Sequence, residues 1–141
     1  MSARKVSTRL VPREEYGTRW KSALERRAAM VRELAAGLVD PALVLAVQAT
    51  IAACSAFTSY HRGERSSADR HLDALSVLAR VPEIDGTADA RKHLTRLLEV
   101  KTELEYSGRS IRPQEAKTLL EHARRFIDFV GKHLPTSNSA I

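Results

Sequence analysis

Residues 41–60 contain no charged side chain, in a chain of which 28% of the residues are charged. The stretch is rich in alanine and includes Leu43, Leu45 and Ile51, so its length and composition approach those of a membrane-spanning helix. Gln48 and several Ser and Thr residues interrupt it, and a helix that is apolar all round can also be enclosed by other helices. We therefore predict the central helix of a soluble domain with no membrane contact, in which Leu45→Ala or Ile51→Ala costs about 2 to 5 kcal/mol.

Four other segments have apolar residues at helical spacing around this one. They are residues 12–38, 66–80, 87–107 and 113–134. Pro12 suits a first helical turn, Thr87 suits an N-cap, and Asp40 followed by Pro41 suits an N-cap and the position after it. No segment has the alternation of a strand, so we predict an all-α fold, an antiparallel up-and-down bundle of about five helices.

The length of 141 residues is that of a single domain. We expect a mobile basic arm over residues 1–11, one helical-bundle domain over residues 12–134 and a disordered tail over residues 135–141. The one cysteine, Cys54, excludes an intramolecular disulfide, and no export signal is recognisable, which favours a cytoplasmic protein. Of the net charge of +6, a balance of +5 lies in the first 36 residues, where it could attract nucleic acid or simply form a solvated face.

Several common sites have no counterpart in the sequence. Asp89 and His93 are four residues apart, as metal ligands can be, but the sequence places no third ligand beside them, so we expect no metal and no cofactor. Glu-x-x-His pairs, Gly-rich phosphate loops and nucleophile elbows are missing as well. A helix-turn-helix over residues 75–92 is disfavoured because its turn would be too long.

The segment 60–71 concentrates Arg, His and Ser residues where the central helix ends and the third predicted helix begins. Guanidinium groups beside a helix N-terminus form a natural phosphate site, because free backbone N–H groups converge there. The candidate nucleotide- or phosphate-binding residues are Arg62, Arg65, Ser66, Ser67 and His71. The alternative is structural: the arginines satisfy carbonyls at the helix end, and His71 donates to a core carbonyl.

Several short motifs recur in a fixed order: residues 52–56 run into 65–71, and residues 101–109 are followed by 115–116 and 123–126. Their order and spacing resemble those of the HEPN domains (higher eukaryotes and prokaryotes nucleotide-binding), in particular a branch of small stand-alone bacterial members. It implies a helical domain that binds a nucleotide, RNA or a nucleotidyltransferase-type protein partner, as in some toxin–antitoxin pairs.

The family's active ribonucleases resemble one another in an Arg followed by a polar residue, with a His four to six residues after the Arg. Arg65 and His71 satisfy that spacing and would be the catalytic pair, but Ser66 stands where Asn, Asp or His is usual, and Asp73 replaces the Tyr of the toxin variant. We therefore favour binding without chemistry. The alternatives are a purely protein-interacting helical module or, less favoured, a metal-independent ribonuclease. Under each of these readings the short, Ala-rich domain favours a homodimer.

Overall fold

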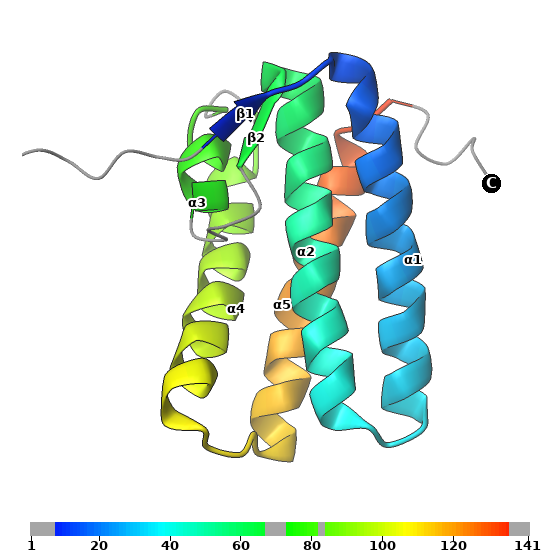
Figure 1. The fold of residues 1–141 in the computed structure, drawn as a ribbon, viewed down its shortest axis with the longest axis vertical. Coiled ribbons are helices and arrows are strands. Elements are labelled where there is room, and N and C mark those ends of the chain that lie inside the picture. The colour runs from blue at the N-terminus through cyan, green and yellow to red at the C-terminus, as the bar shows by residue number, and fades with distance from the viewer. Residues whose placement is uncertain (1–7, 67–72, 82–83, 136–141) are drawn as a thin grey trace, which may run out of the picture.

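Four long helices run alternately up and down the molecule, joined at one end by a short helix and a small sheet (Figure 1). The structure is a computed structural model and describes residues 8–66, 73–81 and 84–135; Ser67 and His71 lie outside these ranges. The helices are α1 (Tyr16–Ala35), α2 (Val39–Arg62), α3 (Asp73–Leu78), α4 (Thr87–Ser107) and α5 (Pro113–Lys132), and a 3-10 turn, η1 (Arg13–Glu15), precedes α1. The predicted all-α bundle of five helices is confirmed.

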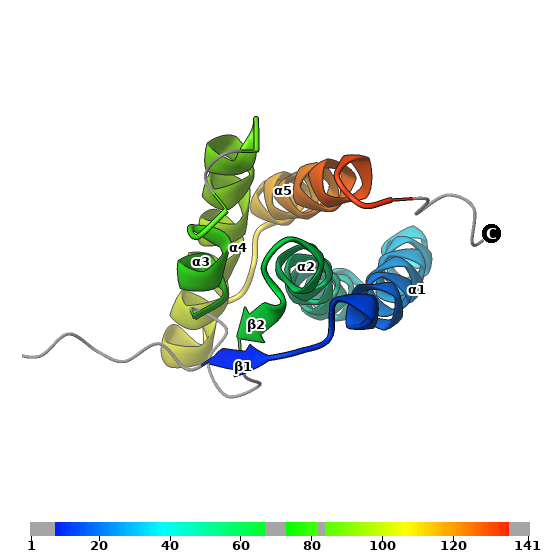
Figure 2. The same ribbon diagram turned by 90° about the horizontal axis from the view of Figure 1, so that it is seen from above.

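Helix α2 supplies the largest part of the described core. It packs most extensively against α1 and next against α5, and α4 packs mainly against α5 (Figure 2). Within the described residues α2 is the one helix long and apolar enough to cross a membrane, but most of that apolar stretch is buried inside the bundle. Phe57 is fully buried, whereas Leu45 and Ile51 are only partly buried and pack against the edge of the core.

Three predicted helix starts are wrong in detail. Helix α2 begins one residue early, at Val39, so Asp40 lies inside the first turn instead of capping it. Thr87 is the first residue of α4, not the residue before it, and its hydroxyl donates to the carbonyl of Ile84 (2.7 Å). Ser66 does not cap the third helix, because it lies in a strand.

The small sheet was not predicted. Strand β1 (Thr8–Leu10) pairs antiparallel with β2 (Glu64–Ser66), with Arg9 opposite Arg65. Neither strand has an alternating apolar pattern, and their pairing joins residues more than fifty positions apart, so local pattern carries no signal for it. Residues 8–10 of the predicted arm are therefore paired backbone, and the sheet holds them beside the end of α2.

Candidate functional site

Helix α2 ends in a left-handed turn that sets the position of the predicted site. Gly63 has φ 67°, its N–H donates to the carbonyl of Ser59 (3.0 Å), and its own carbonyl accepts from the N–H of Val11 (2.9 Å). Glycine adopts this conformation without steric cost and so ends the helix sharply. The turn leaves Arg62 at the helix end and directs Arg65 along β2.

Arg65 is held by neighbouring groups. Its Nε donates to Oε2 of Glu15 (3.1 Å), and one of its terminal nitrogens donates to the carbonyl of Ser66 (3.2 Å). The side chain is only 11% exposed, and Ser66 is buried beside it. In the described part of the chain Arg65 therefore has the contacts of a structural residue; Ser67 and His71, its expected companions, lie outside that part.

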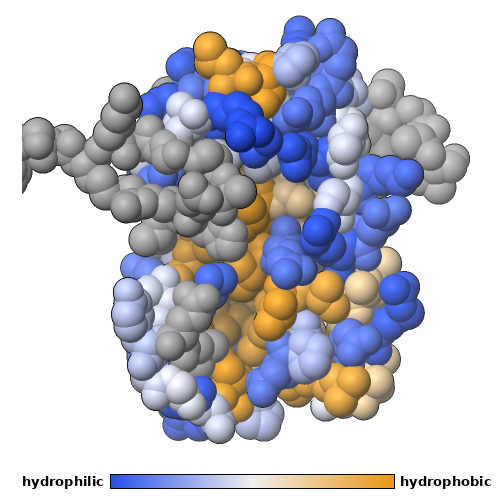
Figure 3. All heavy atoms as spheres, viewed as in Figure 1, coloured by the Kyte–Doolittle hydropathy of each residue, from blue (hydrophilic) through white to orange (hydrophobic). Residues whose placement is uncertain are grey.

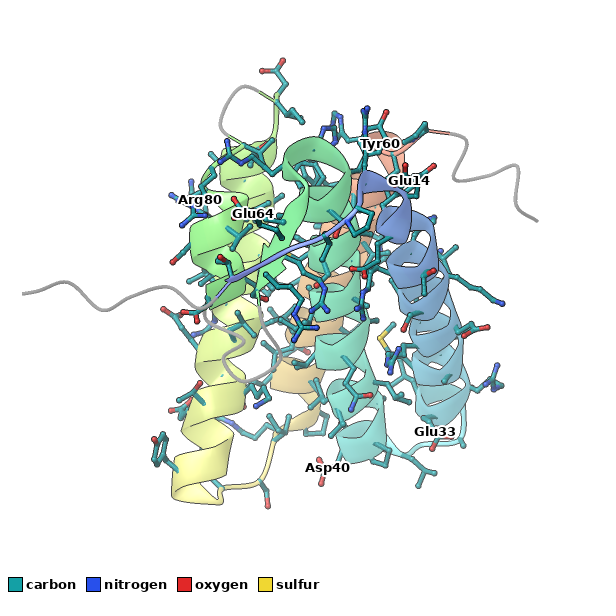
Figure 4. All side chains as sticks on the ribbon, turned by 45° about the horizontal axis from the view of Figure 1, so that its top comes forward. Glu14, Glu33, Asp40, Tyr60, Glu64 and Arg80 are labelled. Carbon is teal, nitrogen blue, oxygen red and sulfur yellow. The ribbon has the colours of Figure 1, made fainter. Side chains whose placement is uncertain are left out.

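Glu64 contacts two further arginines near the end of α2, Arg62 and Arg80. Its buried carboxylate accepts hydrogen bonds from Arg80 at both oxygens (2.9 Å each) and lies 3.4 Å from Nε of Arg62. Glu64 and Arg80 point toward one another at the end of the bundle, far from Glu33 (Figure 4). Arg80 thus compensates the carboxylate, and Arg62 is held only by long contacts.

A pocket of about 510 Å³ lies beside Arg62, and we call it the corner pocket. Its lining residues are Arg13, Tyr60, His61, Arg62 and Gly63. The guanidinium carbon of Arg13 lies 4.0 Å above the centre of the Tyr60 ring. The Nε2–H of His61 donates to the carbonyl of His133 (2.9 Å), which fixes its tautomer. The pocket therefore combines two guanidinium groups with an aromatic face, and none of the described residues that line it is a carboxylate.

Sequence reasoning identified Arg62 but missed Arg13 as a member of this site. Arg13 is brought to Tyr60 by η1 and by the pairing of β1 with β2, which are contacts between distant parts of the chain. The excess of basic residues near the N-terminus was the only signal that could have pointed to it. Among the described residues Arg13 has no ion-pair partner, so its charge is available to a ligand.

A second pocket, of about 380 Å³, lies between α4 and α5, and we call it the histidine pocket. It is lined by His93, Gln114, Lys117, Thr118, Glu121, His122 and Arg125. Nδ1 of His93 lies 2.8 Å from Nδ1 of His122. The sequence paired His93 with Asp89, but Asp89 is exposed and lies 3.9 Å from Lys92. No three His, Cys, Asp or Glu side chains among the described residues converge as a metal-ligand group.

The histidine pocket favours neutral imidazoles. Burial lowers the pKa of His93, and the charge of Arg125 lowers it further. Burial also lowers the pKa of His122, with contributions from His93, Arg96 and Arg125. Hydrogen bonds from Arg124 and Arg125 lower the pKa of Glu121 to about 2, so this carboxylate is charged at neutral pH. At Cys54, by contrast, burial raises the pKa to about 12, so the thiol stays protonated.

The family model of the HEPN domain matches residues 16–134, from the first residue of α1 to just beyond the end of α5. No curated protein and no solved structure matches the chain.

Proposed function

The chain belongs to the HEPN-domain family, and we propose that this domain binds the phosphate of a nucleotide or of RNA in the corner pocket. The observation that carries the proposal is that Arg13 and Arg62 line one pocket with Tyr60, and that none of its described lining residues is a carboxylate. A guanidinium group binds phosphate oxygens through two parallel hydrogen bonds, and a tyrosine face can stack on a base.

The two arginines have different roles in this proposal. The guanidinium carbon of Arg13 already lies over the Tyr60 ring, 4.0 Å from its centre, where a base would stack, so a nucleotide displaces it toward the phosphate. Arg62 is 43% exposed, and its partner Glu64 is satisfied by Arg80, so it can turn to a ligand without leaving a buried charge unpaired.

The test is to titrate the protein into fluorescently labelled mononucleotides and short single-stranded RNAs. Fluorescence polarisation measures their binding at 50 and 200 mM salt. We expect Arg13→Ala and Arg62→Ala each to weaken binding about tenfold, because each loses a charge-assisted hydrogen bond worth about 1.5 kcal/mol. Arg91→Ala is the matched control, since Arg91 is an exposed arginine of α4 outside both pockets. Equal affinities for all three variants would refute the corner pocket as the binding site.

Cleavage of RNA by Arg65 and His71 is not part of this proposal. A transition-state phosphate needs an arginine that is free to contact it, and the guanidinium of Arg65 is already bound to Glu15 and to the carbonyl of Ser66. Incubating the protein with labelled RNA in the presence of a chelator tests this directly, since we expect the substrate to stay intact.

A second candidate function is association with another protein. It is supported by an exposed apolar surface. Val31, Leu34, Leu38 and Val44 are all at least 43% exposed, and they gather where α1 passes into α2. Hydrophobic residues are exposed over much of the lower half of the face in Figure 3. We propose a second copy of this chain as the partner, in keeping with the short domain; a nucleotidyltransferase-type partner would use the same kind of surface.

Sedimentation at tens of micromolar, which is roughly the range of ordinary binding experiments, tests self-association. We expect a dimer that Leu38→Glu and Val44→Glu convert to a monomer. Leu10→Glu is the control, because Leu10 is 83% exposed at the opposite end of the bundle. Apolar association should survive an increase in salt that weakens RNA binding steeply, so the same salt series separates the two functions.

A further inference from the structure

His93 and His122 meet head-on at the edge of the interface between α4 and α5. Their Nδ1 atoms lie 2.8 Å apart and their ring centres 5.1 Å apart, so both Nδ1 atoms lie close to the line between the ring centres. Leu94 and Ala123, which directly follow the two histidines, are fully buried. The packed helices therefore hold the two rings in this arrangement.

This contact can accept one proton and survive. In the neutral pair one Nδ1 carries a hydrogen and donates it to the lone pair of the other Nδ1. A first added proton goes to Nε2 of the donating ring, whose lone pair takes no part in the contact, so the hydrogen bond stays and becomes charge-assisted. A second added proton would place a hydrogen on both Nδ1 atoms and break the contact. The pair can thus carry either no charge or a single positive charge.

The surroundings of the pair lack a counterion for that positive charge. Glu121, the one carboxylate among the described lining residues, already accepts hydrogen bonds from Arg124 and from Nε of Arg125 (2.8 Å). Burial, and then nearby positive charges, lower the pKa of both histidines, so the pair is neutral in the empty pocket. The charged groups that face the pair are Asp89 and Arg96 of α4 and Lys117, Glu121 and Arg125 of α5.

A bound anion would supply the missing negative charge. We propose that the histidine pocket binds a small, doubly charged oxyanion of the sulfate or phosphate type together with one proton, which the histidine pair takes up. Lys117 has no ion-pair partner among the described residues, and Arg125 contacts Glu121 through Nε alone, so both have donors for the anion. The Nε2 atoms of a head-on pair point away from each other, so one ring contacts the anion and the other shares the added charge.

The lining of the pocket favours a free small anion over a nucleotide or RNA. None of the described residues around its volume of about 380 Å³ is a Tyr, Phe or Trp on which a base could stack. The corner pocket, by contrast, offers the ring of Tyr60. The two sites are therefore separate, and either proposal can fail without the other.

The test is a sulfate titration followed by nuclear magnetic resonance of the histidine ring nitrogens, with chloride at equal ionic strength as the reference. Sulfate keeps its double charge at neutral pH, so any proton that is taken up must be bound by the protein. We expect sulfate, but not chloride, to shift the signals of His93 and His122 toward the protonated form at pH 7.0. Sulfate should bind about fivefold more tightly at pH 6.5 than at pH 7.5, because it binds with nearly one proton.

Lys117→Ala should weaken sulfate binding about tenfold, because the anion loses a charged donor. Lys132→Ala is the matched control, since Lys132 is an exposed lysine of the same helix outside both pockets. The His93→Asn, His122→Asn double variant should lose the pH dependence of sulfate binding. Arg13→Ala, which removes a cation of the corner pocket, should leave the histidine response to sulfate intact.

The proposal is overturned if the signals of both histidines respond to sulfate no more than to chloride. It is also overturned if folded Lys117→Ala binds sulfate as tightly as Lys132→Ala does, and thermal melts show whether each variant is folded. Inorganic phosphate and a 5′-mononucleotide, titrated in the same way, separate the two sources of a phosphate group. A response to the mononucleotide but to neither sulfate nor phosphate would overturn the assignment of a free anion.

Discussion

The Nε of Arg65 donates to Oε2 of Glu15 across 3.1 Å, and this contact ties β2 to the turn that precedes α1. The guanidinium is nearly buried, and it also satisfies the carbonyl of Ser66. The arginine expected to bind phosphate thus joins two segments that are distant in the sequence. Its contribution to stability can be measured separately from its contribution to binding.

We predict that Arg65→Ala lowers the free energy of unfolding by about 1 to 2 kcal/mol, because two acceptors lose a charged donor in a poorly solvated place. Arg19→Ala is the matched control: Arg19 reaches the same oxygen at 3.5 Å but is 35% exposed, so the loss should stay below about 0.5 kcal/mol. Urea denaturation measures both. The affinity for nucleotides and RNA should be unchanged in Arg65→Ala. If that variant kept full stability but lost affinity, Arg65 would be a phosphate-binding residue, as predicted from the sequence.

The core of α2 gives a second prediction. Phe57 is fully buried and contacts Phe129 and His61, so Phe57→Ala should cost about 3 to 5 kcal/mol through lost transfer energy and a cavity. Leu45→Ala and Ile51→Ala should fall below the range expected from sequence, because both side chains are only partly buried. Tyr106→Ala, at a position 89% exposed and outside the proposed dimer surface, should cost less than about 0.5 kcal/mol. Thermal or urea unfolding ranks the four; a cost for Leu45→Ala equal to that of Phe57→Ala would contradict this assignment of the core.

What the sequence could and could not predict follows from the range of each interaction. The helices were predictable because periodicity and Pro and Gly signals are local, as at Pro113, which begins α5. The family was recognisable from the order of short motifs. The contacts of Arg13 with Tyr60 and of His93 with His122 were not predictable, because each joins two elements whose relative rotation depends on the packed core.

Two glycines in helices should respond in opposite ways to alanine. A Cβ at Gly131 would lie 3.2 Å from the ring of Trp20, which is buried and cannot move aside easily, so Gly131→Ala should destabilise the protein by about 1 kcal/mol or more. Gly17, in the first turn of α1, has open space at that position, so Gly17→Ala should stabilise the protein by about 0.5 kcal/mol. Thermal melts of the two variants measure the signs. Stabilisation by both changes would mean that Trp20 has room to shift.

The histidine pair gives the protein a pH dependence whose direction follows from burial. The pKa values of His93 and His122 are lowered in the folded protein, so in acid the unfolded chain binds more protons than the folded one. Stability from the neutral pair is therefore complete above the ordinary histidine pKa of about 6.5 and declines as the pH falls through the lowered values.

Replacing both rings by asparagine should flatten this decline, since asparagine does not titrate. Urea midpoints at pH 7.5, 6.5 and 5.5 test the effect. We expect the unchanged protein to lose more stability between pH 6.5 and 5.5 than the His93→Asn, His122→Asn double variant loses. The two proteins would have parallel pH profiles only if the rings were as easily protonated in the fold as in the unfolded chain, which their 2.8 Å contact at the edge of the core opposes.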